Sequence, residues 1–143
     1  MLRDRGRHII TSAIEHHAVL HACEWLETQG YEVTRVPVDG QGLVDMDALR
    51  AAIRSDTILI SVMLANNEVG TIQPVGEIAR LAAEHGIVCH TDAVQAIGKM
   101  PVRVDDLGVQ MLSLTAHKFG GLRGWARWWY GGICRCRPCF TVG

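Results

Sequence analysis

The hydrophobic and polar positions of the chain follow two different periods. Five short runs are rich in β-branched or other apolar residues, at residues 7–12, 31–38, 57–64, 87–91 and 109–114. Runs of this length and composition predict β-strands. The run TILISVML is apolar throughout, which is typical of a strand buried on both faces of a parallel sheet. The run VQMLSL is predicted to be the last strand.

Three segments between these runs have the period of an α-helix. In residues 16–29 the apolar positions recur at helical spacing, and Gly30 follows where such a helix would end. Asp45 can cap a second helix, and Pro74 can open a third that ends at Gly86. Strands that alternate with helices predict an α/β fold with a mostly parallel sheet flanked by helices.

Composition narrows the functional classes. The chain has 143 residues, 48% of them hydrophobic and 20% charged, which suits about one domain with a substantial core. Its net charge of −1 favours neither a nucleic acid nor an anionic membrane as partner. No apolar run approaches the roughly 20 residues of a membrane span, and the N-terminus lacks the apolar stretch of a signal peptide. We therefore expect a cytoplasmic protein that binds no nucleic acid and no membrane.

The polar residues that could do chemistry follow the ends of the predicted strands. They lie in four segments, at residues 12–17, 65–70, 92–95 and 115–118. In open α/β sheets, ligands bind beyond the carboxyl ends of the strands. Four such segments at one edge of a sheet indicate a binding site there.

Asp92 and Lys118 suit the chemistry of pyridoxal 5'-phosphate. A lysine amine can form a Schiff base with the cofactor aldehyde, and an aspartate can keep the pyridine nitrogen protonated so that the ring accepts electrons. Gln95 could approach the same ring if a helix began at Asp92. Taken singly, each residue also has a structural interpretation: Asp92 as a helix cap, Asn67 as part of a turn, and Lys118 as a surface lysine.

Four longer motifs, in order and suitably spaced, carry a family resemblance. They are SAIEHHAVL at 12–20, MLANNEVGTIQPV at 63–75, HTDAVQAIGKMPV at 90–102 and LSLTAHKFGG at 112–121. With these motifs the chain resembles the cysteine desulfurase branch of the pyridoxal-phosphate-dependent, class V aminotransferase-like enzymes. The resemblance implies that residues 1–124 are part of the large domain of a fold type I transferase.

The resemblance also implies a role for each candidate residue. Lys118 carries the cofactor as a Schiff base, Asp92 holds the pyridine nitrogen, and His16 stacks on the ring and moves protons. The other cofactor contacts divide between the ring hydroxyl and the phosphate, with Asn67 and Gln95 at the hydroxyl and Thr115 and His117 at the phosphate.

The implied reaction converts L-cysteine to L-alanine and passes the sulfur to an acceptor protein for iron–sulfur cluster or thiocofactor assembly, in a homodimer. In the family the sulfur is taken by a nucleophilic cysteine on a loop far beyond the lysine. No counterpart of that loop follows here, so we expect the chain alone to be incomplete and inactive. The alternatives are a selenocysteine lyase or another class V lyase and, from a different class, a non-catalytic remnant or interaction fragment.

Residues 125–143 depart from the family pattern. Three of the four tryptophans lie there, at positions 125, 128 and 129, and the stretch has no clear periodicity. Tryptophan has a single codon, TGG, and reading from Trp125 to Gly132 one base earlier permits Val-Gly-Ala-Leu-Val-Val-Arg-Arg. That is the apolar strand ending in arginines which the family pattern expects. We interpret residues 125–143 as a non-homologous tail, read out of frame after Gly124.

The tail has one alternative interpretation, as a metal site. Cys134, Cys136 and Cys139 are close enough in sequence to share a zinc ion. Structural zinc sites usually need four ligands from two separated pairs, and the change of reading frame explains these cysteines without a metal. We therefore predict no metal site.

Overall fold

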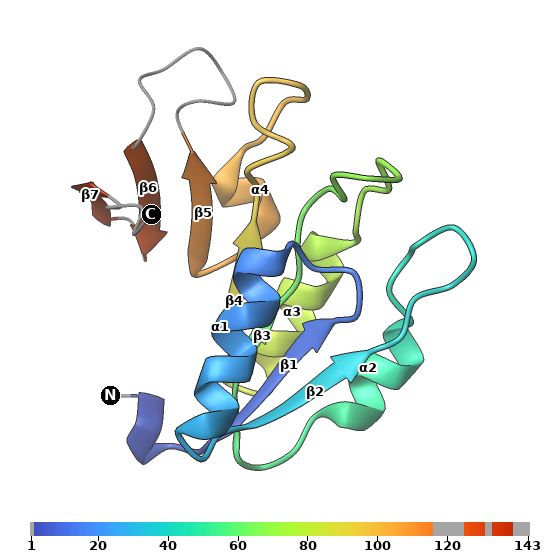
Figure 1. Cartoon of the computed structure of the whole chain (residues 1–143), viewed down its shortest axis with the longest axis vertical. Helices are drawn as coiled ribbons and strands as arrows, with labels where there is room; N and C mark the ends of the chain where they lie inside the picture. Colours follow the sequence, from blue (N-terminus) through green and yellow to red (C-terminus); the bar gives the residue numbers. More distant parts are fainter. Residues whose placement is uncertain (1, 116–124, 131–132, 139–143) are drawn as a thin grey trace.

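The computed structural model describes residues 2–115, 125–130 and 133–138 of the chain. Its centre is a seven-stranded sheet in the order β2-β1-β3-β4-β5-β6-β7 (Figure 1). The strands are β1 (His8–Ser12), β2 (Glu32–Val36), β3 (Thr57–Ser61), β4 (Val88–Asp92), β5 (Met111–Thr115), β6 (Trp125–Tyr130) and β7 (Ile133–Pro138). Strands β1 to β5 pair in parallel, and β6 and β7 pair antiparallel with their neighbours. The predicted α/β class with a mostly parallel sheet is confirmed.

Each parallel strand connects to the next through a helix. The helices are α1 (His17–Thr28), α2 (Met46–Ala52), α3 (Val75–Glu84) and α4 (Val104–Leu107), and a short 3-10 helix, η1 (Leu2–Asp4), precedes β1. Helix α1 lies in front of the sheet in Figure 1, whereas α2 and α3 lie behind it. The sheet therefore has a helix-covered rear face and a front face on which α1 packs.

The predicted ends of three helices are confirmed. The Asp45 carboxylate accepts the backbone N–H groups of Asp47 and Ala48, at 3.0 and 2.9 Å, and so caps α2. Pro74 occupies the N-cap of α3, and Gly86 follows that helix with a φ of +65°, a conformation that favours glycine. His16 caps α1.

The hydrophobic core lies between the sheet and its rear helices. Alternate residues of the central strands face rearward, because successive side chains of a strand point to opposite faces. Ile10, Ile60, Cys89 and Leu112 belong to the core together with helix residues Leu49, Val75, Ile78, Ala79 and Ala82. No described residue of α1 belongs to this cluster. The rear face therefore supplies most of the packing.

The prediction that residues 109–114 form the last strand is wrong. Two more strands follow. The whole of β5 pairs with β6, from Met111 opposite Tyr130 to Thr115 opposite Ala126. Tail periodicity gave no hint of a strand, because backbone pairing at an open sheet edge needs no particular side-chain pattern. The interpretation of residues 125–143 as an out-of-frame tail stays a prediction.

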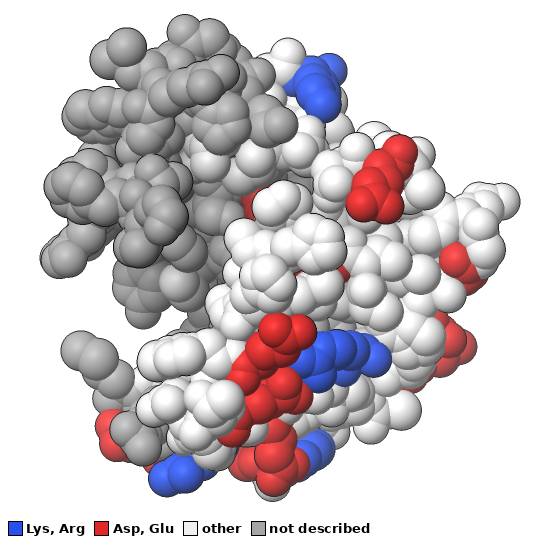
Figure 2. Space-filling model, viewed as in Figure 1, with Lys and Arg blue, Asp and Glu red and all other residues white. Residues whose placement is uncertain are grey.

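Charges of both signs lie beside one another on the described surface of the face that Figure 2 shows. Arg35 pairs with Glu27 at 2.9 Å, and Arg54 pairs with both Glu32 and Asp56. Among the described residues, no helix has the length and apolar character needed to cross a membrane.

Candidate functional site

Alternate residues of three neighbouring strands bring polar groups to the front face of the sheet. The strands contribute Ser61, the pair His90 and Asp92, and the pair Ser113 and Thr115. Strand register places Ser61 opposite His90 and Asp92 opposite Ser113. Because these strands are parallel, their carboxyl ends deliver the side chains to one edge of the sheet.

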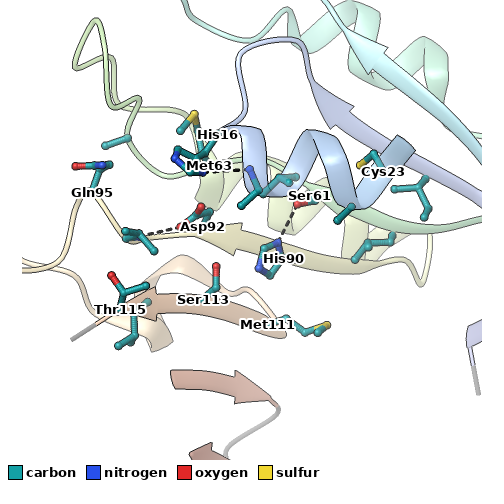
Figure 3. Close-up of a pocket in the computed structure, with 18 of the residues that line it drawn as sticks. His16, Cys23, Ser61, Met63, His90, Asp92, Gln95, Met111, Ser113 and Thr115 are labelled. Atoms are coloured by element: carbon teal, nitrogen blue, oxygen red, sulfur yellow. Dashed lines mark hydrogen bonds between the residues drawn. The ribbon is translucent and has the colours of Figure 1, made fainter. Parts of the chain in front are cut away.

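These side chains line a cavity of about 700 Å³ between α1 and the sheet (Figure 3). The inner side of α1 forms one wall, with Val19, Cys23 and Leu26, and the strands form the floor. Of the sequence-predicted site residues, four line this cavity: His16, Asp92, Gln95 and Thr115. The structure therefore brings together residues that lie up to 99 positions apart in the chain.

Asp92 ends β4 on the cavity side. Its Oδ1 accepts the backbone N–H of Val94 at 2.9 Å and so holds the turn that follows β4, where no helix begins for Asp92 to cap. The segment after Asp92 forms turns, so the helix considered at this point is not present. Gln95 nevertheless lines the cavity, where its Oε1 accepts a hydrogen bond from Lys99 Nζ at 3.2 Å.

His16 stands at the opposite wall, at the start of α1. Its Nδ1 accepts the backbone N–H of Ala18 at 3.2 Å, which holds the imidazole at the helix end. The residue is exposed and also lines the cavity, as Figure 3 shows. A ring in this position can contact a ligand while remaining open to water.

Thr115 supplies a hydroxyl group to the lining of the cavity. Its Oγ1 is buried, and among the described residues it has no hydrogen-bond partner. A buried hydroxyl of this kind carries a desolvation cost of about 1–3 kcal/mol unless a ligand or water satisfies it. Together with the Asp92 carboxylate, this hydroxyl fits the cofactor expected from the sequence, which has an anionic phosphate and a basic ring nitrogen.

Of the predicted residues that the structure describes, Asn67 does not line this cavity. Asn67 is exposed and lies outside the set of lining residues. Its neighbour Asn66 is buried instead, donates to the carbonyl of Ile14 at 3.0 Å, and accepts the N–H groups of the following turn. His117 and Lys118 lie outside the described residues. Their assigned roles stay predictions.

Sequence reasoning missed the hydrogen-bonded pair His90 and Ser61. The His90 Nδ1 and Ser61 Oγ atoms share a hydrogen bond of 2.8 Å, and burial lowers the pKa of His90. Burial therefore favours the neutral form of this imidazole on the cavity floor. Strand alternation counted back from Asp92 places His90 on the same face, so this signal was present in the sequence.

Glu15 is a second residue that sequence reasoning missed. Its side chain is only 6% exposed, and burial raises the pKa of this carboxyl to about 7. Its sequence neighbours are a mixture of polar and apolar residues at the start of the predicted helix. Such a mixture does not indicate that the Glu15 carboxyl is buried.

The described residues show no group of three or more histidine, cysteine or acidic side chains that could hold a metal ion. The described free cysteines are Cys23 and Cys89, both buried. The side chains of the three tail cysteines lie outside the described set.

Comparison with known proteins gives a consistent result. The aminotransferase class-V family matches residues 2–126. Cysteine desulfurase IscS of Methanosarcina thermophila is 62% identical over 122 residues, which are 85% of this chain and 30% of that protein. Cysteine desulfurase IscS of Dictyoglomus turgidum is 57% identical over 123 residues, 86% of this chain and 31% of its own length. The chain thus spans about a third of the length of these curated relatives.

Solved structures with the same arrangement are also found. A NifS-like protein superposes with a TM-score of 0.87 at 41% identity, covering 99% of this chain and 40% of that protein. SspA in complex with cysteine superposes with a TM-score of 0.84 at 42% identity, covering 90% of this chain and 37% of that protein. The sheet and its flanking helices therefore follow an arrangement already seen in longer proteins.

Proposed function

Since the chain belongs to the aminotransferase class-V family, we propose that it is part of a pyridoxal-phosphate-dependent cysteine desulfurase. Its substrate would be L-cysteine, which it would convert to L-alanine as sulfur leaves. The observation that supports this most directly is the convergence of His16, Asp92 and Thr115 on one cavity at the carboxyl ends of the strands. The identity of 62% to a cysteine desulfurase supports the choice within the family.

The described residues would hold the cofactor at three points. The Asp92 carboxylate would accept a hydrogen bond from the protonated pyridine nitrogen, a charge-assisted contact that favours the protonated ring. The Thr115 hydroxyl, buried without a described partner, would donate to the phosphate. The His16 imidazole would lie against the ring from the α1 side. Bound there, pyridoxal phosphate would supply an electron sink for the Cα carbanion of the substrate.

The side chains that line the cavity would then shield the bound cofactor from bulk water on the side that faces the sheet. Val19 and Leu26 of α1 line one wall, and Met63 and Met111 contribute to the floor. Low polarity around a ring and a carboxylate strengthens their electrostatic interaction. His16 is the described residue best placed to move a proton at the open side, because its ring reaches both the cavity and the solvent.

We propose further that the intact protein passes sulfur to an acceptor protein for iron–sulfur cluster or thiocofactor assembly, and that it acts as a homodimer. Support for the pathway comes from relatives of the IscS type.

Covalent attachment of the cofactor tests the proposal. The sequence contains two lysines, Lys99 and Lys118. After incubation of the whole chain with pyridoxal phosphate and reduction with borohydride, peptide mass spectrometry should find the cofactor on Lys118. The K118A variant should lose the adduct, and K99A, the matched control, should retain it. An adduct divided equally between the two lysines would contradict a specific site.

A further inference from the structure

A buried acid joins two strands at the point where the fold changes direction. Strand β1 has β2 on one side and β3 on the other. The chain leaves β1 for the front helix α1 and reaches β3 through the rear helix α2, so connections diverge to opposite faces between β1 and β3 (Figure 1). Such switch points open a crevice at the carboxyl ends of the strands. Glu15 lies in this crevice.

The Glu15 carboxylate bridges the crevice with one oxygen. Its Oε1 accepts the Ser12 hydroxyl at 2.5 Å, on the β1 side, and the backbone N–H of Met63 at 2.9 Å, on the β3 side. Its Oε2 is buried and accepts no hydrogen bond from the described residues. A short chain of two hydrogen bonds therefore ties the end of β1 to the end of β3.

One end of this link, Met63, lines the cavity, and so does His16, the residue after Glu15. The His16 ring is held by the N–H of Ala18, so its place depends on where α1 begins. Because α1 begins at His17, two residues after Glu15, the Glu15 side chain connects the start of this helix with the backbone of Met63.

We propose that Glu15 is a positioning residue, which holds the ends of β1 and β3 together and thereby fixes the positions of His16 and Met63 at the cavity. The gain for cofactor binding rests on the proposed function, whereas the link between the strands does not. Glu15 touches no reacting atom in this arrangement and acts through its two neighbours.

The link is expected to respond to pH. The pKa of Glu15 is raised to about 7, mainly by burial and to a smaller extent by the Asp92 carboxylate, while the hydrogen bonds from Ser12 and Met63 oppose the rise. Cys23 of α1 is the other titratable group whose electrostatic interaction with Glu15 is resolved. Between pH 6 and 8 the bridging oxygen changes from a neutral to a charged acceptor, which strengthens its hydrogen bonds while opposing Asp92.

Backbone amide signals of the ¹⁵N-labelled whole chain test the proposal. The Met63 amide reports the link itself, and the Ala18 amide reports the cap that holds His16. In the wild type the Met63 signal should shift with a midpoint near pH 7. In E15Q, which keeps an acceptor oxygen, this step should vanish while the Met63 signal stays near its low-pH position. E24Q, an acid-to-amide change at an exposed position of α1, should behave as the wild type.

E15A removes the acceptor and gives the decisive comparison. Both amide signals should be displaced at every pH, and the affinity for pyridoxal phosphate should fall by about tenfold, as expected for one lost hydrogen bond to a charged group. Displacement of the Met63 amide alone, with the Ala18 amide and cofactor affinity unchanged, would overturn the proposal, because Glu15 would then serve only the packing of the strands.

Two further outcomes are covered by the same measurements. If E15A does not fold, S12A takes its place, because it removes one of the two hydrogen bonds of Glu15 with little change in volume. An undisturbed Ala18 amide in S12A would overturn the proposal. If the wild type binds no pyridoxal phosphate, the proposed function fails, and the two amide signals still decide whether Glu15 positions α1.

Discussion

Helices α3 and α1 pack on opposite faces of the same sheet, yet they bury very different parts of themselves. Four residues of α3 are buried, Val75, Ile78, Ala79 and Ala82. In α1 only Cys23 is buried, and Trp25 is 62% exposed. The rear face is packed as a core, whereas the front face retains a cavity of about 700 Å³.

This difference shows how one strand can serve stability and chemistry at once. In β4, Cys89 faces the core while His90 and Asp92 face the cavity. Polar groups are costly in a packed interior unless they are hydrogen-bonded. An open front face lets the same strand carry a carboxylate and an imidazole to a ligand without weakening the packing behind it.

The largest expected effect comes from truncating a rear-face residue. Ile78 of α3 is 0% exposed, so I78A should lower the free energy of unfolding by about 2–5 kcal/mol. Leu26 of α1 is half-buried and lines the cavity, so L26A should cost less than about 1.5 kcal/mol, since less area returns to water. Urea unfolding of the two variants measures both values.

Equal losses in I78A and L26A would contradict the comparison. They would mean that the front face contributes as much packing as the rear face. A matched control is V69A, which truncates an apolar side chain that is 67% exposed and should leave stability nearly unchanged.

Sequence patterns predicted the rear half of the molecule better than the front. Helix α3 has both an apolar stripe and clear boundary residues, Pro74 and Gly86, so its place followed directly. The cavity residues Asp92 and Thr115 were found because strand ends concentrate ligand sites. Glu15 lies in one of these strand-end segments, but its burial could not be predicted, because it depends on a contact between positions 15 and 63 that no local pattern records.

The next effect concerns the pH dependence that Glu15 gives to stability. Burial raises its pKa from 4.5 to about 7. Below pH 4.5 the carboxyl is protonated in both states. Between pH 4.5 and 7 the unfolded chain releases the proton while the folded chain keeps it, so stability falls as pH rises. Above pH 7 the folded chain holds the carboxylate in its charged form. The free energy of unfolding is then lower by the full amount of about 3 kcal/mol, at 1.36 kcal/mol per pKa unit.

E15Q should remove this contribution. The difference in unfolding free energy between E15Q and the wild type should grow from pH 4.5 to 7 in favour of E15Q and then stay constant. Measuring the difference cancels the contributions of exposed carboxylates such as Asp56. A difference that does not vary with pH would show that the Glu15 carboxyl titrates alike in folded and unfolded chains.

The reaction rates of two cysteines, one on each face of the sheet, should differ by a smaller free energy. Cys89 faces the core, and burial raises its pKa to about 12. Burial also raises the pKa of Cys23, but this residue lines the cavity and the Arg35 guanidinium opposes the shift. Because the thiolate is the nucleophile, Cys23 should react with iodoacetamide about tenfold faster or more.

Peptide mass spectrometry separates these two cysteines from the three in the tail. In denaturant Cys23 and Cys89 should react at similar rates, which serves as the control. Similar rates in the native chain would mean that the reagent reaches both faces alike, contrary to the packing of α3 over Cys89.

The smallest expected effect on stability is the difference between the loss of the Asp45 cap and the loss of the His16 cap. Asp45 accepts two N–H groups of α2, so D45A should cost about 1 kcal/mol, and D45N, which keeps an acceptor, should cost less. His16 accepts one N–H of α1 at 3.2 Å on an exposed surface, so H16A should cost only about 0.5 kcal/mol. The order reverses for the cofactor: H16A should weaken pyridoxal phosphate binding, whereas D45A should leave it unchanged. Thermal unfolding with and without the cofactor measures both quantities, and equal cofactor stabilisation in the two variants would show that His16 is a cap and nothing more.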